Sequence, residues 1–191
     1  ARYQRQPTAQ IGERLRELRQ IRKSEVRGDV NQAYDDLYKA ADELGVIDDA
    51  SDLYLLAQNF VKQDATAFQK MPAVLAKIRQ VFGREIDPDI PFEDQRILTD
   101  FPKLHSLYRE VSKEYGTALK SGDSQKQFYT GQIRELLDSK LSAFDDPVYG
   151  TFAQHKKAVD GFWLEEYHNV FRKGLGGKIP NETRWGQVTP D

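Results

Sequence analysis

The sequence predicts an all-α protein, an elongated bundle of long antiparallel helices with short connecting helices and an irregular C-terminal tail. Two observations predict this class. Apolar residues recur in steps of three and four along most of the chain, and no strand-like alternation of useful length occurs. Charged residues make up 30% and hydrophobic residues 39% of the 191 positions, which suits helices that each bury one stripe.

The longest helix is predicted to begin at Thr8 and to end near Gly45. Thr8 follows Pro7 and can cap the helix, and no proline interrupts the segment. Glycine is favoured just past a helix end, as at Gly45. Such a helix extends roughly 50 Å. Its stripe consists of Ile11, Leu15, Leu18, Val26, Val30, Ala33, Leu37, Ala40 and Leu44.

Two short helices and a second long one are predicted next. Ser51 is expected to cap the first short helix, and Pro72 lies in the first turn of the second, which ends at Gly83. A proline-rich connector follows. The second long helix is predicted from Phe92 to about Lys120, and Pro102 inside it predicts a kink or break near Phe101.

The remaining helices follow a turn at "KSGDS" and an expected cap at Asp146. In the last helix the aromatic run "FWLEEYHNVF" keeps helical spacing, so we expect it to pack in the core. Periodicity is lost after residue 174. The predicted organisation is therefore an N-terminal extension at 1–7, a helical bundle domain at 8–174, and a linker or tail toward a following segment at 175–191. Because the chain begins at Ala1 and its only methionine is Met71, we expect it to be a domain of a longer protein.

The glycine-rich stretch "FRKGLGGKI" is predicted to be a helix exit and not a phosphate-binding loop. A P-loop needs a glycine five positions before Gly177 and a serine or threonine after Lys178, where the chain has Arg172 and Ile179. A helix instead favours a glycine just past its end, and Gly174 fills that place.

The residue inventory indicates no catalytic residues, no cofactor and no metal site. There are no cysteines, which excludes disulfides, thiolate ligands and cysteine nucleophiles. The sequence contains neither a Glu-Ser pair nor a Gly-x-Ser-x-Gly elbow. One Glu165-x-x-His168 motif occurs without the second that a di-iron bundle requires. No stretch approaches the roughly 20 apolar residues of a membrane span, and no signal peptide is recognisable.

A basic stretch near the N-terminus is the one candidate contact site. A stripe of these side chains could follow nucleic-acid phosphates without sequence preference, or could pair with acidic neighbours in a bundle. The net charge of −2 favours neither partner. The residues of possible nucleic-acid contact are Arg14, Arg16, Arg19, Arg22, Lys23 and Arg27.

Four segments, read in order, resemble large virion proteins of tailed phages or prophages. "RKSEVRGDVNQAYDDLYKAADELG" is similar to a recurrent long helix, and "IPFEDQRILTDFPKLHSLYREV" to the start of a second one. "ALKSGDSQKQFYTGQIRELLDSKL" resembles the next turn and helix, and "FRKGLGGKI" with "VTPD" resembles the exit. The likeness covers most of residues 10–190 and departs at Pro102, where a continuous helix is usual.

The resemblance implies a non-enzymatic structural or assembly module of an internal virion or DNA-ejection protein. Its partners would be other segments of the same protein or other virion proteins, possibly with DNA, and it would be assembled in the bacterial cytoplasm and located in the virion. Two alternatives stay open. One is a sequence-independent nucleic-acid-binding helical module. The other is an accessory domain of a large virion enzyme, such as a polymerase or a transglycosylase.

Overall fold

The computed structural model describes residues 8–66, 69–89, 91 and 96–173, and it is mostly helical, which confirms the predicted helical class. The predicted tail at 175–191, with Gly177 and Lys178, lies outside the described residues. The chain divides into two compact units. The first, here called the terminal unit, comprises 1–37 and 155–191, and the second, the central unit, comprises 38–154.

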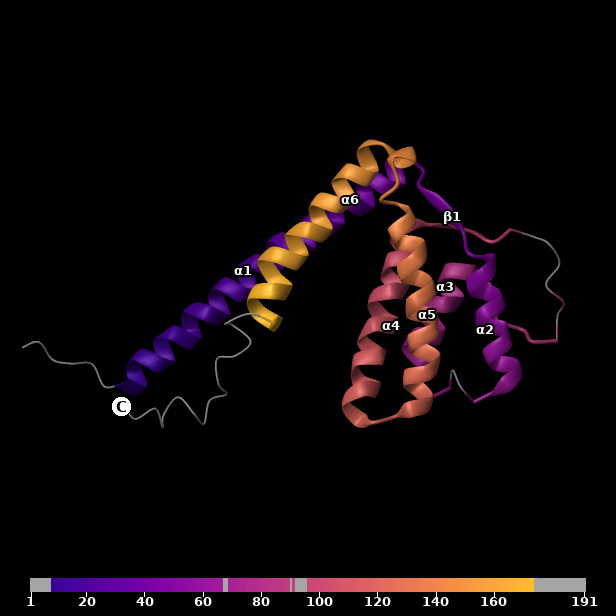
Figure 1. Ribbon diagram of the computed structural model, residues 1–191, viewed down its shortest axis with the longest axis horizontal. Helices are drawn as coiled ribbons and strands as arrows, with labels where there is room; N and C mark the ends of the chain where they lie inside the picture. The colour runs from indigo at the N-terminus through magenta and orange to yellow at the C-terminus, as the bar shows by residue number, and fades with distance from the viewer. Residues whose placement is uncertain (1–7, 67–68, 90, 92–95, 174–191) are drawn as a thin grey trace, which may run out of the picture. The chain divides into compact units, whose positions relative to one another are not determined.

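The terminal unit contains two helical segments that run antiparallel, side by side (Figure 1). The first is most of α1 (Thr8–Glu43), which begins and ends as the sequence predicts. The second is α6 (Thr151–Phe162), followed without a break by a π-helix (Trp163–Lys173). The hydroxyl of Tyr34 donates to Asp160 Oδ1 at 3.0 Å, and Lys156 Nζ donates to Asp160 Oδ2 at 2.6 Å. The first contact joins α1 to α6, and the second lies within α6 and holds Asp160 in place.

An aromatic cluster joins α1 to the π-helix. Val26 and Val30 are buried against Tyr167 and Phe171, with Tyr34, Phe162 and Trp163 packed around them. The expected core packing of the aromatic run is therefore confirmed for Tyr167 and Phe171, whereas Val170 is exposed. The α-helical period of the sequence did not predict the wider turns of the π-helix.

The central unit combines helices with a small antiparallel sheet, which the sequence reading missed. Strand β1 (Ile47–Asp49) pairs with β2 (Leu98–Asp100), with Ile47 opposite Asp100. Strands of three residues are too short to show a period of two. The helices are α2 (Ser51–Gln63), α3 (Pro72–Phe82), α4 (Phe101–Ser121) and α5 (Ser124–Ala143), and a 3-10 turn spans Pro147–Tyr149.

Helix α4 begins at Phe101, so the predicted break near Phe101 is confirmed, and the prediction that the helix already includes residues 96–100 is wrong. Asp100 Oδ1 accepts a hydrogen bond from the backbone N–H of Lys103 at 2.9 Å and caps the helix. Pro102 lies in the first turn, where its missing N–H would have no intrahelical partner. The apolar residues Ile97 and Leu98 belong to the segment that enters and forms β2.

Two predicted caps are also displaced. Ser51 is the first residue of α2 and not its cap, and its hydroxyl and N–H both donate to Asp49 Oδ1. Asp146 caps the 3-10 turn, accepting from Val148 N at 3.0 Å, and α6 begins four residues after Pro147, at Thr151. Asp146 therefore caps the chain locally, although not at the helix that the sequence indicated, whereas the Ser51 side chain caps no helix.

A group of aromatic rings forms the centre of the central unit. Phe101 is fully buried and meets Phe144 and Phe152 edge to face, with ring centroids 5.2 and 5.1 Å apart. His105 stacks on Phe101, and its Nδ1 is hydrogen-bonded to the hydroxyl of Tyr38. Helices α4 and α5 pack against each other and supply a large part of the remaining core. Their buried aliphatic residues are Leu104, Leu107, Val111, Ile133, Leu137 and Leu141.

Within the described ranges, no helix has the length and apolar character needed to cross a membrane.

Candidate functional site

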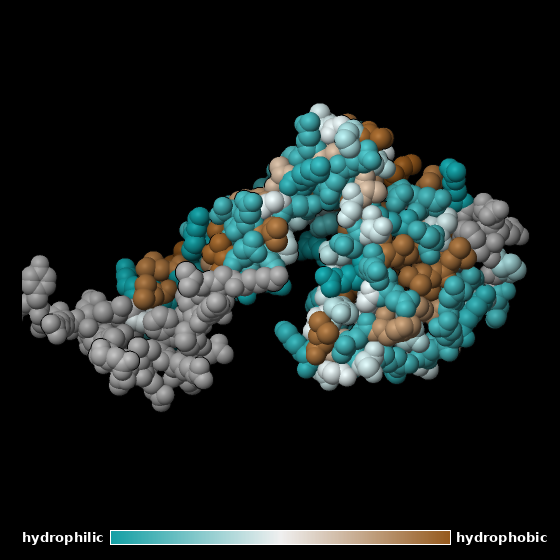
Figure 2. All heavy atoms as spheres, viewed as in Figure 1, coloured by the Kyte–Doolittle hydropathy of each residue, from teal (hydrophilic) through white to brown (hydrophobic). Residues whose placement is uncertain are grey.

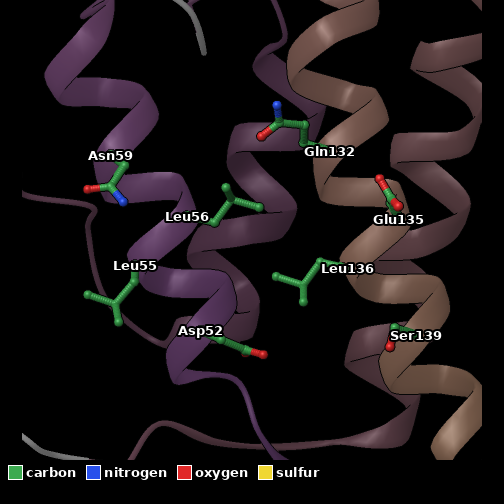
Figure 3. A pocket seen from close by; sticks show the side chains of 8 residues that line it. All are labelled: Asp52, Leu55, Leu56, Asn59, Gln132, Glu135, Leu136 and Ser139. Atoms are coloured by element: carbon green, nitrogen blue, oxygen red, sulfur yellow. The ribbon is translucent and has the colours of Figure 1, made fainter.

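A shallow, open groove of about 650 Å³ lies between α2 and α5 in the central unit (Figure 3). Leu56 and Leu136 point toward its middle from the two helices, and Leu55, which also lines it, points from α2 to the side away from α5. Polar side chains edge the apolar floor on both sides. These are Asp52 and Asn59 on α2, and Gln132, Glu135 and Ser139 on α5. We call this surface the α2–α5 groove.

The helical phases of α2 and α5 explain why leucines are left at the surface. On α2 the core side is formed by Leu53, Tyr54, Ala57 and Phe60, all buried. On α5 the core side includes Tyr129, Ile133 and Leu137, and the rings of Phe60 and Tyr129 meet edge to face at 4.8 Å. Leu55, Leu56 and Leu136 adjoin these buried positions in sequence. At about 100° per residue they are therefore turned toward the outer edge of the contact.

Lys140 fixes one end of the groove. Its side chain is only 11% exposed, and its ammonium donates to the backbone carbonyl of Asp49 at 2.6 Å. The same nitrogen lies 2.8 Å from Asp52 Oδ1 and 3.4 Å from Asp48 Oδ2. Because Asp52 also lines the groove, this contact holds the start of α2 against the end of α5 and sets the spacing of the two walls.

A second polar network holds the other ends of the same helices. Gln125, in the first turn of α5, donates from Nε2 to Asp64 Oδ2 at 2.5 Å, just after α2 ends. Gln125 Oε1 accepts from Lys70 Nζ at 2.6 Å. The two walls are therefore tied together near both ends, which makes the groove a fixed feature of the central unit.

Two carboxyl groups near the groove have shifted pKa values. Hydrogen bonds from the Ser51 hydroxyl and N–H lower the pKa of Asp49 below 3.8. The Thr66 hydroxyl and N–H lower the pKa of Asp64 in the same way. Both shifts favour the charged carboxylate, so these groups act as hydrogen-bond acceptors near neutral pH and not as proton donors. Among the described residues, no group of three or more His, Asp or Glu side chains could hold a metal ion.

The predicted basic stretch lies on α1, in the terminal unit, with two different environments. Arg14, Arg22 and Arg27 are exposed, and Arg22 lies 3.5 Å from Glu25 on the next turn. Arg16, Arg19 and Lys23 are half-buried. Half of the predicted stripe is therefore partly covered by protein, and nucleic-acid contact stays a prediction.

The histidines occupy unrelated surroundings. His105 is buried in the ring cluster, His155 is exposed on α6, and the ring of His168 lies 4.8 Å from that of Trp163. Glu165 is exposed on the π-helix. The ring contact gives His168 a packing role beside Trp163.

The sequence reading missed the α2–α5 groove. A usable signal was present, because Leu55 and Leu56 are adjacent, as are Leu136 and Leu137. One narrow helical face cannot bury two adjacent leucines, so one leucine of each pair is left at the edge of that face.

Comparisons with protein-family models, with curated proteins and with solved structures found no match to this chain.

Proposed function

We propose that this chain is a non-enzymatic assembly module whose helical faces bind other proteins. The α2–α5 groove carries the proposal. Small-molecule sites are usually deep and enclose most of their ligand, whereas this groove is open along the helices. A leucine floor between polar edges suits the apolar side of an amphipathic helix from a partner.

The antiparallel helix pairs support the finer architecture that the sequence predicts. Within the terminal unit α1 runs against α6, and within the central unit α4 runs against α5. We propose that the chain belongs to the class of bundles with long antiparallel helices, used as a spacer or assembly element.

The likeness of residues 10–190 to internal virion and DNA-ejection proteins supports a setting for this module. In that setting the chain is located in the virion of a tailed phage or prophage, and its partners are segments of the same large protein or other virion proteins. The likeness consists of helices and turns in a fixed order, and it supplies no catalytic motif.

Mass spectrometry of purified particles tests this proposal. Particles from the host that encodes the chain should contain its peptides at a constant ratio to the coat protein. Leu55→Glu in the groove should lower this ratio at least about fivefold, the effect of about 1 kcal/mol of lost contact. Val148→Glu, at an exposed position of the 3-10 turn, is the matched control and should change nothing. Peptides found only in particle-free lysate would contradict the proposal.

Nucleic-acid binding is the weaker alternative, because Arg16, Arg19 and Lys23 are half-buried. Titration of the purified chain with fluorescent duplex and single-stranded DNA at two salt concentrations separates the two functions. Phosphate contacts weaken steeply with salt. Salt-dependent binding that is lost on charge reversal at these residues would favour the alternative. An accessory role in a larger enzyme predicts no cell-wall hydrolysis by this chain alone, and real hydrolysis would overturn the proposal.

A further inference from the structure

A second apolar surface lies on α1, in the terminal unit. Leu15, Leu18 and Ile21 succeed one another at intervals of three residues, and they are 51%, 52% and 56% exposed. Arg14 and Arg22, both exposed, flank them. We call this surface the α1 apolar face. In Figure 2 hydrophobic side chains lie at the surface over the N-terminal half of α1, and others lie over α2 and α5.

The α1 apolar face is distinct from the aromatic cluster of its own unit. That cluster is centred on Val26 and Val30, which contact Tyr167 and Phe171. At about 100° per residue, Leu18 is turned by about 80° and Ile21 by about 140° from Val26. Leu15 points within about 20° of Val26 but lies three turns nearer the N-terminus. All three side chains are about half exposed, so the π-helix does not bury this part of α1.

The α1 apolar face and the α2–α5 groove are complementary in charge. The groove is edged by the carboxylates of Asp52 and Glu135, whereas the α1 apolar face is flanked by Arg14 and Arg22. The carboxylate of Asp52 already lies 2.8 Å from the ammonium of Lys140, so the carboxylate of Glu135 attracts an arginine more strongly. The Arg22–Glu25 contact at 3.5 Å is an exposed pair of neighbouring turns, which is worth little and can be given up on binding.

The two surfaces also match in length and in kind. Leu15 and Ile21 are separated by about 9 Å along the helix axis, and Asp52 and Asn59, which mark the ends of the groove on α2, by about 10 Å. The face offers aliphatic side chains at helical spacing, and the groove offers a leucine floor between two parallel walls. This is the geometry of a helix bound in a groove.

We propose that the α1 apolar face of one copy of this chain docks in the α2–α5 groove of a second copy. The contact joins two different surfaces, so a pair of copies keeps one free groove on one copy and one free face on the other, and association continues into a ring or an open chain. The inference rests on the proposed assembly function and names its partner as a second copy of the same chain.

Analytical ultracentrifugation of two complementary variants tests the docking. The wild-type mass should rise with concentration between about 1 and 200 µM, the range of micromolar contacts, and exceed that of a dimer. Leu18→Glu removes the face and leaves the groove, while Leu55→Glu does the reverse. Each variant alone should stay at the 22.0 kDa mass of one chain. Mixed in equal amounts they should form a species of twice that mass and nothing larger, because only one functional face and one functional groove remain.

Controls separate docking from misfolding and from charge effects. Val148→Glu, at a residue that is 86% exposed and belongs to neither surface, should associate like the wild type. Circular dichroism should show unchanged helix content in every variant. Glu135→Arg brings a like charge toward Arg14 and Arg22 and should weaken association at least about fivefold at low salt, and less at about 0.5 M salt, where charges are screened.

Three outcomes overturn the inference. One is a wild-type protein that stays monomeric over the whole concentration range. Another is a mixture of the two variants that stays monomeric although both are folded. The third is loss of association in Leu18→Glu but not in Leu55→Glu, which would show α1 pairing with α1. A monomeric wild type leaves the assembly proposal intact if the chain is still found in purified particles, so the two proposals fail separately.

Discussion

Replacing Lys140 with methionine tests whether one ammonium group sets the spacing of the groove walls. The change removes a hydrogen bond to the Asp49 carbonyl at 2.6 Å and a contact with Asp52 at 2.8 Å, and it keeps a side chain of similar length. Hydrogen bonds to charged groups contribute about 1.5–3 kcal/mol each to stability. The side chain of Asp52 is half exposed, so its share is smaller.

We therefore expect Lys140→Met to lower the free energy of unfolding by about 2–3 kcal/mol. For a chain of this size, that loss corresponds to a decrease in Tm of about 5–10 °C. The decrease should be confined to the central unit. Both tryptophans, Trp163 and Trp185, belong to the sequence ranges of the terminal unit, so their fluorescence provides an internal reference.

The assay is urea denaturation followed by circular dichroism, with hydrogen exchange of α2 and α5 as the local measurement. Lys113→Met is the matched control, because Lys113 is 73% exposed and lies 3.7 Å from Glu110, and ion pairs at the surface contribute about 0–1 kcal/mol. If Lys140→Met and Lys113→Met shift the urea midpoint equally, or if exchange in α2 and α5 is unchanged, the role assigned to Lys140 is wrong.

Three other changes test the fold. Phe101→Ala should destabilise the central unit by about 3–5 kcal/mol in urea, because it empties the centre of the ring cluster, whereas Phe101→Leu should cost less than half of that. Gly122→Ala should lower the free energy of unfolding by about 1 kcal/mol, because this glycine, just after α4, has φ 72°. Gly116→Ala, inside α4, should raise it by about 0.5–1 kcal/mol, because nothing lies near the added methyl group. Thermal unfolding measures both changes. The pKa of Asp49 is lower in the folded state than its ordinary value of 3.8. The stabilisation from its charged carboxylate is therefore present above pH 3.8 and is lost as the pH falls through the pKa of the folded state. Asp49→Asn should accordingly flatten the acid limb of a stability–pH curve.

The longest elements were the most predictable from the sequence. The helix from Thr8 to Glu43 has many stripe residues and no proline, and Thr8 after Pro7 and Gly45 mark its two ends in the sequence. Pro102 shows the opposite case. The sequence places a proline inside a periodic run, but the period does not say whether the proline interrupts a helix or begins one. In the structure, Pro102 lies at the beginning of a helix, because the side chain of Asp100 caps a helix that starts at Phe101.

The candidate groove could not be predicted because it depends on which side of each helix meets a neighbour. The pairs Leu55–Leu56 and Leu136–Leu137 indicate more apolar surface than one stripe needs, but they do not tell which leucine is buried. Tertiary packing decides this. Leu137 is fully buried in the core of the central unit, while Leu136 turns to the groove. Similarly, the sequence indicates only a helix lysine at position 140, and the contact of its ammonium with the Asp49 carbonyl of β1 is known only from the structure.

The exposed leucines also separate stability from association. Burial stabilises in proportion to the apolar area removed from water, about 1.5–3 kcal/mol for a fully buried leucine. Leu18 is half exposed, so Leu18→Glu should cost the folded chain no more than about 1 kcal/mol, although it removes the centre of the α1 apolar face. Single exposed aliphatic side chains are common on monomers, but a run at helical spacing flanked by arginines indicates a binding surface. A variant that melts like the wild type and yet fails to associate would identify Leu18 as a contact residue, whereas parallel loss of both properties would assign it to the core of the terminal unit.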